Sequence, residues 1–198
     1  MNRLRTGILG GTFDPIHNGH LFLALEAMQV AGLDRVLFIP NRVPPHKAAP
    51  GVGPEERWAM LRMAIAGEPR FEASRIELDR EGLSYTLDTV SALSTDNEVV
   101  FLCGADAFHS PWHRPQDVLE QLDTLLVAHR HGVPPELPPV LAQMPPALKG
   151  KIQHLDFPDI AISSSDLRAR IAAGRPTRYL LPDSVHDYIR ERGLYQGG

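Results

Sequence analysis

The stretch Gly10-Gly11-Thr12-Phe13-Asp14-Pro15-Ile16-His17-Asn18-Gly19-His20 carries the strongest signal in this chain. It follows an apolar segment, residues 6–10, that is typical of a buried strand, and it enters residues 20–31, whose apolar side chains recur at helical spacing. Two glycines allow a ligand to approach the backbone closely, and the first turn of a helix offers unpaired N–H groups at the positive end of its dipole. If the helix begins near Asn18, both imidazoles can face the same anion. The stretch therefore predicts a phosphate-binding turn between a strand and a helix.

The same residues allow two other interpretations. They lack the Gly-Lys-Ser/Thr of a P-loop and the G-x-G-x-x-G spacing of a dinucleotide site. A helix-capping turn with two surface histidines is one alternative, and the length of the string directly after a strand argues against it. A zinc site at His17 and His20 is the other, but no further ligands occur at the spacing that a zinc site needs.

Short apolar runs alternate with segments of helical periodicity along the rest of the chain. Strands separated by helices in this way indicate an α/β protein with one doubly wound, mostly parallel sheet, whose ligands bind beyond the carboxyl ends of the strands. We expect a single domain over residues 1–198, of which 160–198 form a small helical part. Further strands are expected at residues 35–39, 71–78, 98–103, 124–128 and 152–155, helices at 55–66, 85–93, 116–122, 165–173 and 184–192, and a loop or broken helix at 133–146.

Composition narrows the class of protein. Hydrophobic residues make up 43% of the 198 residues and charged residues 22%, as in ordinary globular proteins. The formal net charge of -4 argues against non-specific binding to nucleic acid, which depends on a basic surface. No apolar stretch approaches the ~20 residues that span a membrane, and no signal-peptide pattern occurs. The single cysteine, Cys103, excludes an internal disulfide, so we expect a protein of the reducing cytoplasm.

A second candidate anion site is Ile162-Ser163-Ser164-Ser165-Asp166-Leu167-Arg168. Serines at a helix start, unpaired N–H groups and Arg168 together suit an anion, although an ordinary N-cap beside a surface arginine would look the same. Lys47, in Pro44-Pro45-His46-Lys47, follows the second expected strand and could reach the same phosphates. The alternative for this lysine is a solvated loop. The first anion site favours a functional interpretation of residues 162–168, whereas the role of Lys47 rests largely on the family resemblance given below.

The string His17-Asn18-Gly19-His20 resembles the H-x-G-H signature of the nucleotidyltransferases related to class I aminoacyl-tRNA synthetases. Within that superfamily the chain is similar to the bacterial nicotinate mononucleotide adenylyltransferases over nearly its whole length. The resemblance implies a Rossmann-like nucleotidyltransferase fold and transfer of the adenylyl group of ATP to nicotinate mononucleotide in NAD biosynthesis, with Mg²⁺ accompanying ATP. The similarity rests on five ordered pieces: residues 10–20, residues 44–47, Tyr85-Thr86-Leu87-Asp88-Thr89, Gly104-Ala105-Asp106 with Trp112, and residues 162–168.

The resemblance also implies which residues catalyse the reaction and which bind the substrates. Catalysis would fall to His17, His20, Lys47 and Arg168. ATP would be bound by Gly10, Gly11, Thr12, Phe13, Gly104, Asp106, Ile162, Ser163 and Ser164. The mononucleotide would be bound by Asp14, Lys47, Thr86, Asp106 and Trp112. In this scheme Thr86 and the N–H groups of its helix receive the nicotinate carboxylate, and the indole of Trp112 stacks on the pyridine ring.

Several alternatives stay open at this stage. Trp112 could pack in the core, and Thr86 and Asp106 could simply cap helices. The family often has proline where this chain has His131, and a metal pair of His129 and His131 is a weaker interpretation. Other acceptors, such as phosphopantetheine, or a non-catalytic nucleotide-binding module are the rival functions. The expected partners are ATP and nicotinate mononucleotide, without nucleic acid or membrane, and a homo-oligomer is left open.

Overall fold

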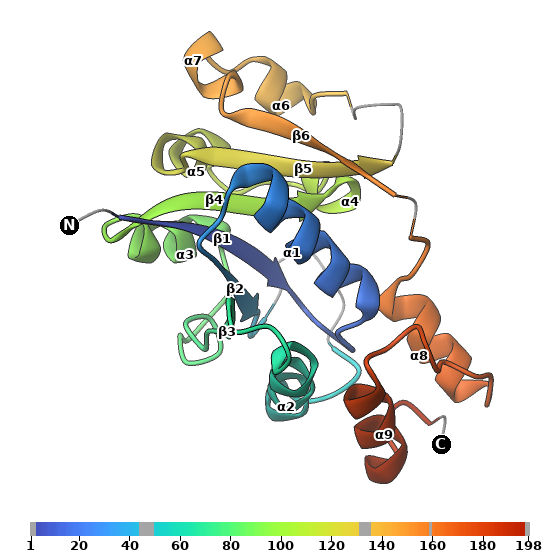
Figure 1. Ribbon diagram of the computed structural model, residues 1–198. Helices are drawn as coiled ribbons and strands as arrows, with labels where there is room; N and C mark the ends of the chain where they lie inside the picture. Colours follow the sequence, from blue (N-terminus) through green and yellow to red (C-terminus); the bar gives the residue numbers. More distant parts are fainter. Residues whose placement is uncertain (1–2, 44–49, 131–135, 159, 197–198) are drawn as a thin grey trace.

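A computed structural model describes residues 3–43, 50–130, 136–158 and 160–196. Within them, six strands form one parallel sheet in the order β3-β2-β1-β4-β5-β6 (Figure 1). The strands are β1 (Leu4–Gly11), β2 (Arg35–Pro40), β3 (Phe71–Ala73), β4 (Asn97–Gly104), β5 (Thr124–Arg130) and β6 (Ile152–Phe157). The helices are α1 (Asn18–Ala31), α2 (Pro54–Ile65), α3 (Thr86–Leu93), α4 (Ala105–Phe108), α5 (Pro115–Gln121), α6 (Pro139–Ala142), α7 (Pro146–Lys149), α8 (Ser164–Ala172) and α9 (Asp183–Arg192).

Both faces of the sheet are buried at its centre, which explains why strands β1, β2, β4 and β5 are mostly apolar instead of alternating with polar residues. Successive residues of a strand point to opposite faces, so Ile8 and Leu37 enter one core while Leu9 and Phe38 enter the other. Side chains of α1, α2, α8 and α9 belong to the core around Leu9, and side chains of α3, α4, α5 and α6 belong to the core around Ile8. This arrangement confirms the predicted doubly wound parallel sheet.

The strand order reverses at β1, which pairs with β2 on one side and with β4 on the other. A ligand crevice is expected at such a switch point, beyond the carboxyl ends of the strands. Gly11 ends β1 and lies opposite Pro40 of β2, and Gly104 ends β4 at the same edge. The topology therefore brings the turn before α1 and the turn before α4 to one edge of the sheet.

The observed elements differ from the expected ones at two places. The strand expected at 71–78 ends at Ala73, so it was wrong beyond that residue. The later part of that segment turns back, and the carboxylate of Glu77 accepts a hydrogen bond from Thr89 Oγ1 of α3 at 2.7 Å. Its apolar alternation reflects burial beside α3, and not pairing in the sheet. The four-residue helix α4 was not expected.

The loop or broken helix expected at 133–146 is confirmed for residues 136–146, where α6 and α7 each begin at a proline. Proline suits the first helical position because its missing N–H would have no helical partner there. In the part of the chain that the structure covers, no helix is both long and apolar enough to span a membrane.

Gly7 of the central strand β1 allows α1 and β2 to pack closely against the sheet. A Cβ atom at Gly7 would lie 2.7 Å from Leu33 Cδ1 and 3.3 Å from Val36 Cγ2. We expect Gly7→Ala to lower the free energy of unfolding by about 1–3 kcal/mol, the usual cost of overpacking a core. Urea denaturation measures this change.

Gly67→Ala is the matched control, because no atom lies within 4 Å of the added Cβ. It should change the free energy of unfolding by no more than about 0.5 kcal/mol. Equal stability of the two variants would show that the packing at Gly7 does not require glycine.

Candidate active site

Two stacked histidines mark the start of α1. His17 is the N-cap residue, with extended backbone (φ -146°, ψ 169°), and the helix begins at Asn18 as the predicted geometry requires. The rings of His17 and His20 lie 3.7 Å apart with an angle of 27° between their planes. A Cβ at Gly19 would meet His17 Nδ1 at 3.1 Å, so glycine leaves the space that this ring occupies. The structure thus brings both imidazoles to the amino end of the helix.

The protonation of the pair follows from its surroundings. His17 is 6% exposed, and burial lowers its pKa to about 4, so the ring is neutral at pH 7. Among the described residues, its buried Nδ1 has no hydrogen-bond partner. His17 N–H donates to His20 Nδ1 at 3.2 Å, so in the neutral form of His20 the proton lies on Nε2. His17 can therefore donate a hydrogen bond to an anion without carrying the cost of a buried charge.

Phe13 packs against His20 of this pair. It is 1% exposed, and its ring meets the His20 ring edge-on at a centroid distance of 5.1 Å. Its backbone is left-handed (φ 49°), which turns the chain sharply after β1. A Cβ at Gly11 would lie 3.0 Å from Phe13 Cε1, so this glycine accommodates the phenyl ring. In this arrangement Phe13 orients His20.

Helix α8 carries the second predicted anion segment to the first. The Ser163 hydroxyl accepts a hydrogen bond from Asp166 N at 3.1 Å and caps the helix, as predicted. Ser164 Oγ donates to Pro15 O at 2.9 Å, and Arg168 Nη1 donates to Asp14 O at 2.7 Å. These bonds join residues about 150 positions apart in sequence. The two segments therefore form one site at the carboxyl edge of the sheet.

Asp14 lies inside this site and not on its surface. It is 2% exposed, its Oδ1 accepts a hydrogen bond from Tyr195 Oη at 2.7 Å, and its Oδ2 accepts one from Gly51 N at 2.6 Å. Arg57 is fully buried nearby, and its Nη1 donates to Thr12 O at 2.8 Å. The sequence predicts Asp14 as a ligand of the mononucleotide, whereas the structure shows its carboxylate bound within the protein.

The third and fourth predicted pieces lie side by side. Thr86 is the first residue of α3 and is half-buried. The preceding ring of Tyr85 lies 4.4 Å from that of His113, the neighbour of Trp112. Trp112 is half-buried, its Nε1 donates to Phe108 O at 3.1 Å, and its ring meets Phe101 edge-on at 6.0 Å. The indole is therefore held in place while part of it stays accessible.

The turn after β4 supplies the remaining described candidates. Gly104 is the N-cap of α4, and no atom lies within 4 Å of where its Cβ would be. Asp106 is exposed in the first turn of that helix, and Ile162 is half-buried just before α8. These residues lie at the carboxyl edge of the sheet or beside α8, which docks there.

Some predicted residues lie outside the described chain or away from the site. Lys47 and His131 fall in segments that the structure does not describe. His129 is buried on β5, with its ring 5.6 Å from that of His154. Across the described ranges, no group of three or more histidine, cysteine, aspartate or glutamate side chains could hold a metal ion.

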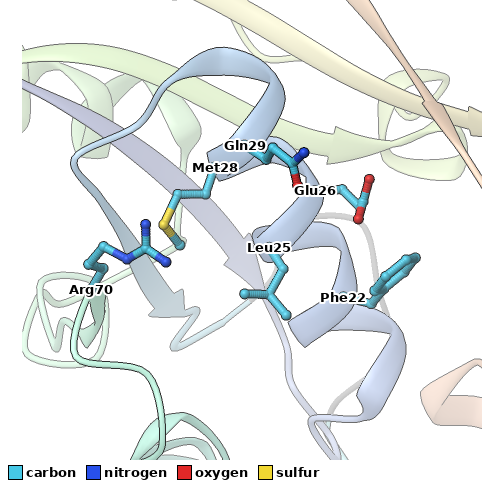
Figure 2. A pocket seen from close by; sticks show the side chains of 6 residues that line it. All are labelled: Phe22, Leu25, Glu26, Met28, Gln29 and Arg70. Atoms are coloured by element: carbon cyan, nitrogen blue, oxygen red, sulfur yellow. The ribbon is translucent and has the colours of Figure 1, made fainter.

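A large hollow on the surface lies elsewhere. It measures about 470 Å³, and Figure 2 shows the side chains along α1 that line it together with Arg70. Arg70 directly precedes β3, so the hollow faces the amino edge of the sheet. None of the predicted site residues is among its lining residues, which are Phe22, Leu25, Glu26, Met28, Gln29 and Arg70.

Comparison with known proteins agrees with this geometry. The cytidylyltransferase-like family matches residues 8–170. The chain is 42% identical to the probable nicotinate-nucleotide adenylyltransferase of Symbiobacterium thermophilum, over 98% of this chain and 96% of that protein. It is 43% identical to the protein of the same name from Aeromonas salmonicida, over 96% of each.

Solved structures show the same fold. Nicotinic acid mononucleotide adenylyltransferase of Plasmodium falciparum, complexed with NaAD, has a TM-score of 0.73 and 16% identity over 97% of each chain. The matched family and the two bacterial relatives place the chain in the nicotinate-nucleotide adenylyltransferase family of nucleotidyltransferases.

Proposed function

We propose that this protein transfers the adenylyl group of ATP to nicotinate mononucleotide, giving nicotinate adenine dinucleotide and pyrophosphate, as a step of NAD biosynthesis in the cytoplasm. The observation that carries the proposal is the pair of stacked histidines at the start of α1, with Arg168 of α8 bound to Asp14 in the turn just before them. The buried single cysteine is consistent with a reducing compartment. Membership of the family supports this choice of substrates.

The chemistry asks the protein to position two anions and to stabilise charge. The 5′-phosphate of the mononucleotide attacks the α-phosphorus of ATP in line, and pyrophosphate leaves. This phosphate is anionic at neutral pH, so the reaction needs no strong general base. The ring N–H groups of His17 and His20, the positive end of the α1 dipole and the charge of Arg168 would stabilise the transition state. Lys47 would add a further positive charge.

ATP and nicotinate mononucleotide would bind on either side of the pair formed by His17 and His20. Gly10, Gly11, Thr12, Ile162, Ser163 and Ser164 would line the ATP side, with Gly104 and Asp106 reaching the ribose hydroxyls, and residues 160–198 would complete that side. The nicotinate carboxylate would meet Thr86 and the N–H groups at the start of α3, where the helix dipole favours a negative charge. Trp112 would stack on the pyridine ring.

Mg²⁺ fits this site as a companion of ATP. Mg²⁺ usually keeps several water ligands and is bound through substrate phosphates and one or two carboxylates. In this proposal the ion would enter the site with the triphosphate. When bound, Mg²⁺ would neutralise charge on the departing pyrophosphate.

Pyrophosphate release tests the proposal. Purified protein with ATP and Mg²⁺ receives nicotinate mononucleotide, nicotinamide mononucleotide or phosphopantetheine in parallel reactions. We expect fast release with nicotinate mononucleotide and much slower release with the other two, because a pocket built around a charged carboxylate rejects a neutral amide. Faster release with phosphopantetheine would overturn the pyridine pocket. Binding of ATP without release from any acceptor would indicate a non-catalytic module.

Substitution of Trp112 tests the mononucleotide pocket. We expect Trp112→Ala to raise the KM for nicotinate mononucleotide about tenfold, the scale of losing one stacked aromatic ring, while the KM for ATP stays unchanged. Trp112→Phe keeps a ring but also loses the hydrogen bond to Phe108 O, so it separates stacking from that bond. Initial rates at varied concentrations of each substrate measure both constants. A defect confined to ATP would contradict the assignment.

A further inference from the structure

Three distant parts of the chain meet on the carboxylate of Asp14. Tyr195, three residues after α9, donates to Oδ1, and Gly51, three residues before α2, donates to Oδ2. Arg168 of α8 lies 3.5 Å from Oδ2 through Nη1, which also donates to the Asp14 carbonyl oxygen. The site described above uses Arg168 alone among these three residues. The role of the other two residues follows from what they do to the arginine.

The charges around Asp14 sum to a net positive charge at the turn between β1 and α1. Arg57 is fully buried, and although burial lowers its pKa, the nearby charge of Asp14 partly offsets this effect. A guanidinium stays protonated in proteins, so one carboxylate faces two cations, Arg57 and Arg168. If Asp14 formed a two-pronged ion pair with Arg168, the guanidinium would be neutralised and turned toward the protein. The contacts that Asp14 makes elsewhere therefore decide how much of Arg168 remains for a ligand.

Tyr195 occupies the oxygen that such an ion pair would need. Burial raises the pKa of Tyr195, and the hydrogen bond to Asp14 raises it further, so the hydroxyl remains protonated and donates to Oδ1. Arg168 is then held through Nη1, the nitrogen that contacts Asp14. Tyr195 has a left-handed backbone (φ 61°), a conformation that costs free energy for a residue with a bulky side chain. The surrounding contacts hold the ring at this place despite that cost.

Gly51 supplies an independent sign of close fitting. A Cβ on Gly51 would lie 3.2 Å from Arg168 Cδ, 3.3 Å from Tyr195 Cε1 and 3.4 Å from Asp14 Oδ2. The space beside the Gly51 backbone is thus bounded by all three side chains. Any side chain there would press on Arg168 and Tyr195 together.

We propose that Tyr195 is a positioning residue of the ATP site: it holds one oxygen of Asp14 so that Arg168 keeps part of its guanidinium available to the triphosphate. The identity of this anion rests on the proposed function. Without the Tyr195 hydroxyl, the buried Oδ1 loses its donor, and Arg168, already 3.5 Å from Oδ2, can turn to replace it. The arginine then pairs with Asp14 and contributes less to ATP binding.

Tyr195→Phe tests this proposal, with ATP affinity measured by titration calorimetry in the absence of any acceptor. We expect the Kd for ATP to rise about tenfold, the scale of losing one hydrogen bond to a charged group, with the Kd for nicotinate mononucleotide unchanged. Tyr188→Phe is the matched control, because Tyr188 Oη donates to Glu56 Oε2 at 2.6 Å, a bond of the same kind away from Asp14. The control should leave the Kd for ATP within about twofold, whatever it does to the thermal unfolding midpoint.

A second pair of variants tests the same proposal without changing Tyr195. Gly51→Ala should weaken ATP binding as Tyr195→Phe does, whereas Gly53→Ala, whose Cβ meets no atom within 4 Å, should not. Unchanged ATP affinity in Tyr195→Phe and Gly51→Ala would overturn the proposal. An equal loss of affinity for both nucleotides would also overturn it, because it would indicate general damage to the fold.

The same titrations separate this proposal from the proposed function. Weaker ATP binding in Tyr195→Phe, in a protein that releases no pyrophosphate, would support the positioning role and refute the reaction. Normal ATP affinity in the variant, in a protein that makes the dinucleotide, would support the reaction and refute the positioning role.

Discussion

Close packing of α1 against β1 is the contact on which both the sheet and the candidate site depend. Gly7 in the middle of β1 lets Leu33, just after α1, approach to a distance that any side chain would block. The six residues between the strand and the helix then have to reverse the chain within a short span. That turn places the amino end of α1 at the carboxyl edge of the sheet, where strand order reverses. The proposed phosphate binding would follow from how the first strand and helix pack.

The electrostatics of the turn resolve an apparent conflict. The chain as a whole carries a net charge of -4, yet its proposed substrates are polyanions. Positive charge is concentrated locally instead, through Arg57, Arg168 and the amino end of α1, with Asp14 balancing one guanidinium. Burial lowers the pKa of His17 to about 4, so this ring would act as a neutral donor to the proposed substrate. A small number of groups held in fixed positions can therefore attract a triphosphate to an acidic protein.

The sequence was most informative where structure is determined locally. Apolar periodicity predicted the parallel sheet, and the serines before α8 predicted a cap that the structure confirms at Ser163. The same reasoning overextended the third strand, because burial of Glu77 beside α3 imitates the alternation of a strand. An arginine at 57, on the buried face that also carries Met60 and Leu61, was an available sign of an internal charge.

Long-range contacts left no such local sign. Tyr195 lies 181 positions from Asp14, and nothing in its neighbourhood along the chain indicates a carboxylate partner. The resemblance implied that Asp14 binds the mononucleotide, and no local pattern indicated that its carboxylate would also contact Gly51, Arg168 and Tyr195. Individual motifs predicted candidate segments, and the fold shows which side chains hold others in place.

A crystal structure of the protein with a non-hydrolysable ATP analogue and Mg²⁺ would locate the phosphate site directly. We expect the triphosphate at the start of α1, within hydrogen-bond distance of His17, His20 and Arg168, with Asp14 still bound to Tyr195. A triphosphate bound elsewhere, such as in the hollow lined by Phe22 and Arg70, would contradict the assignment of the phosphate site (Figure 2).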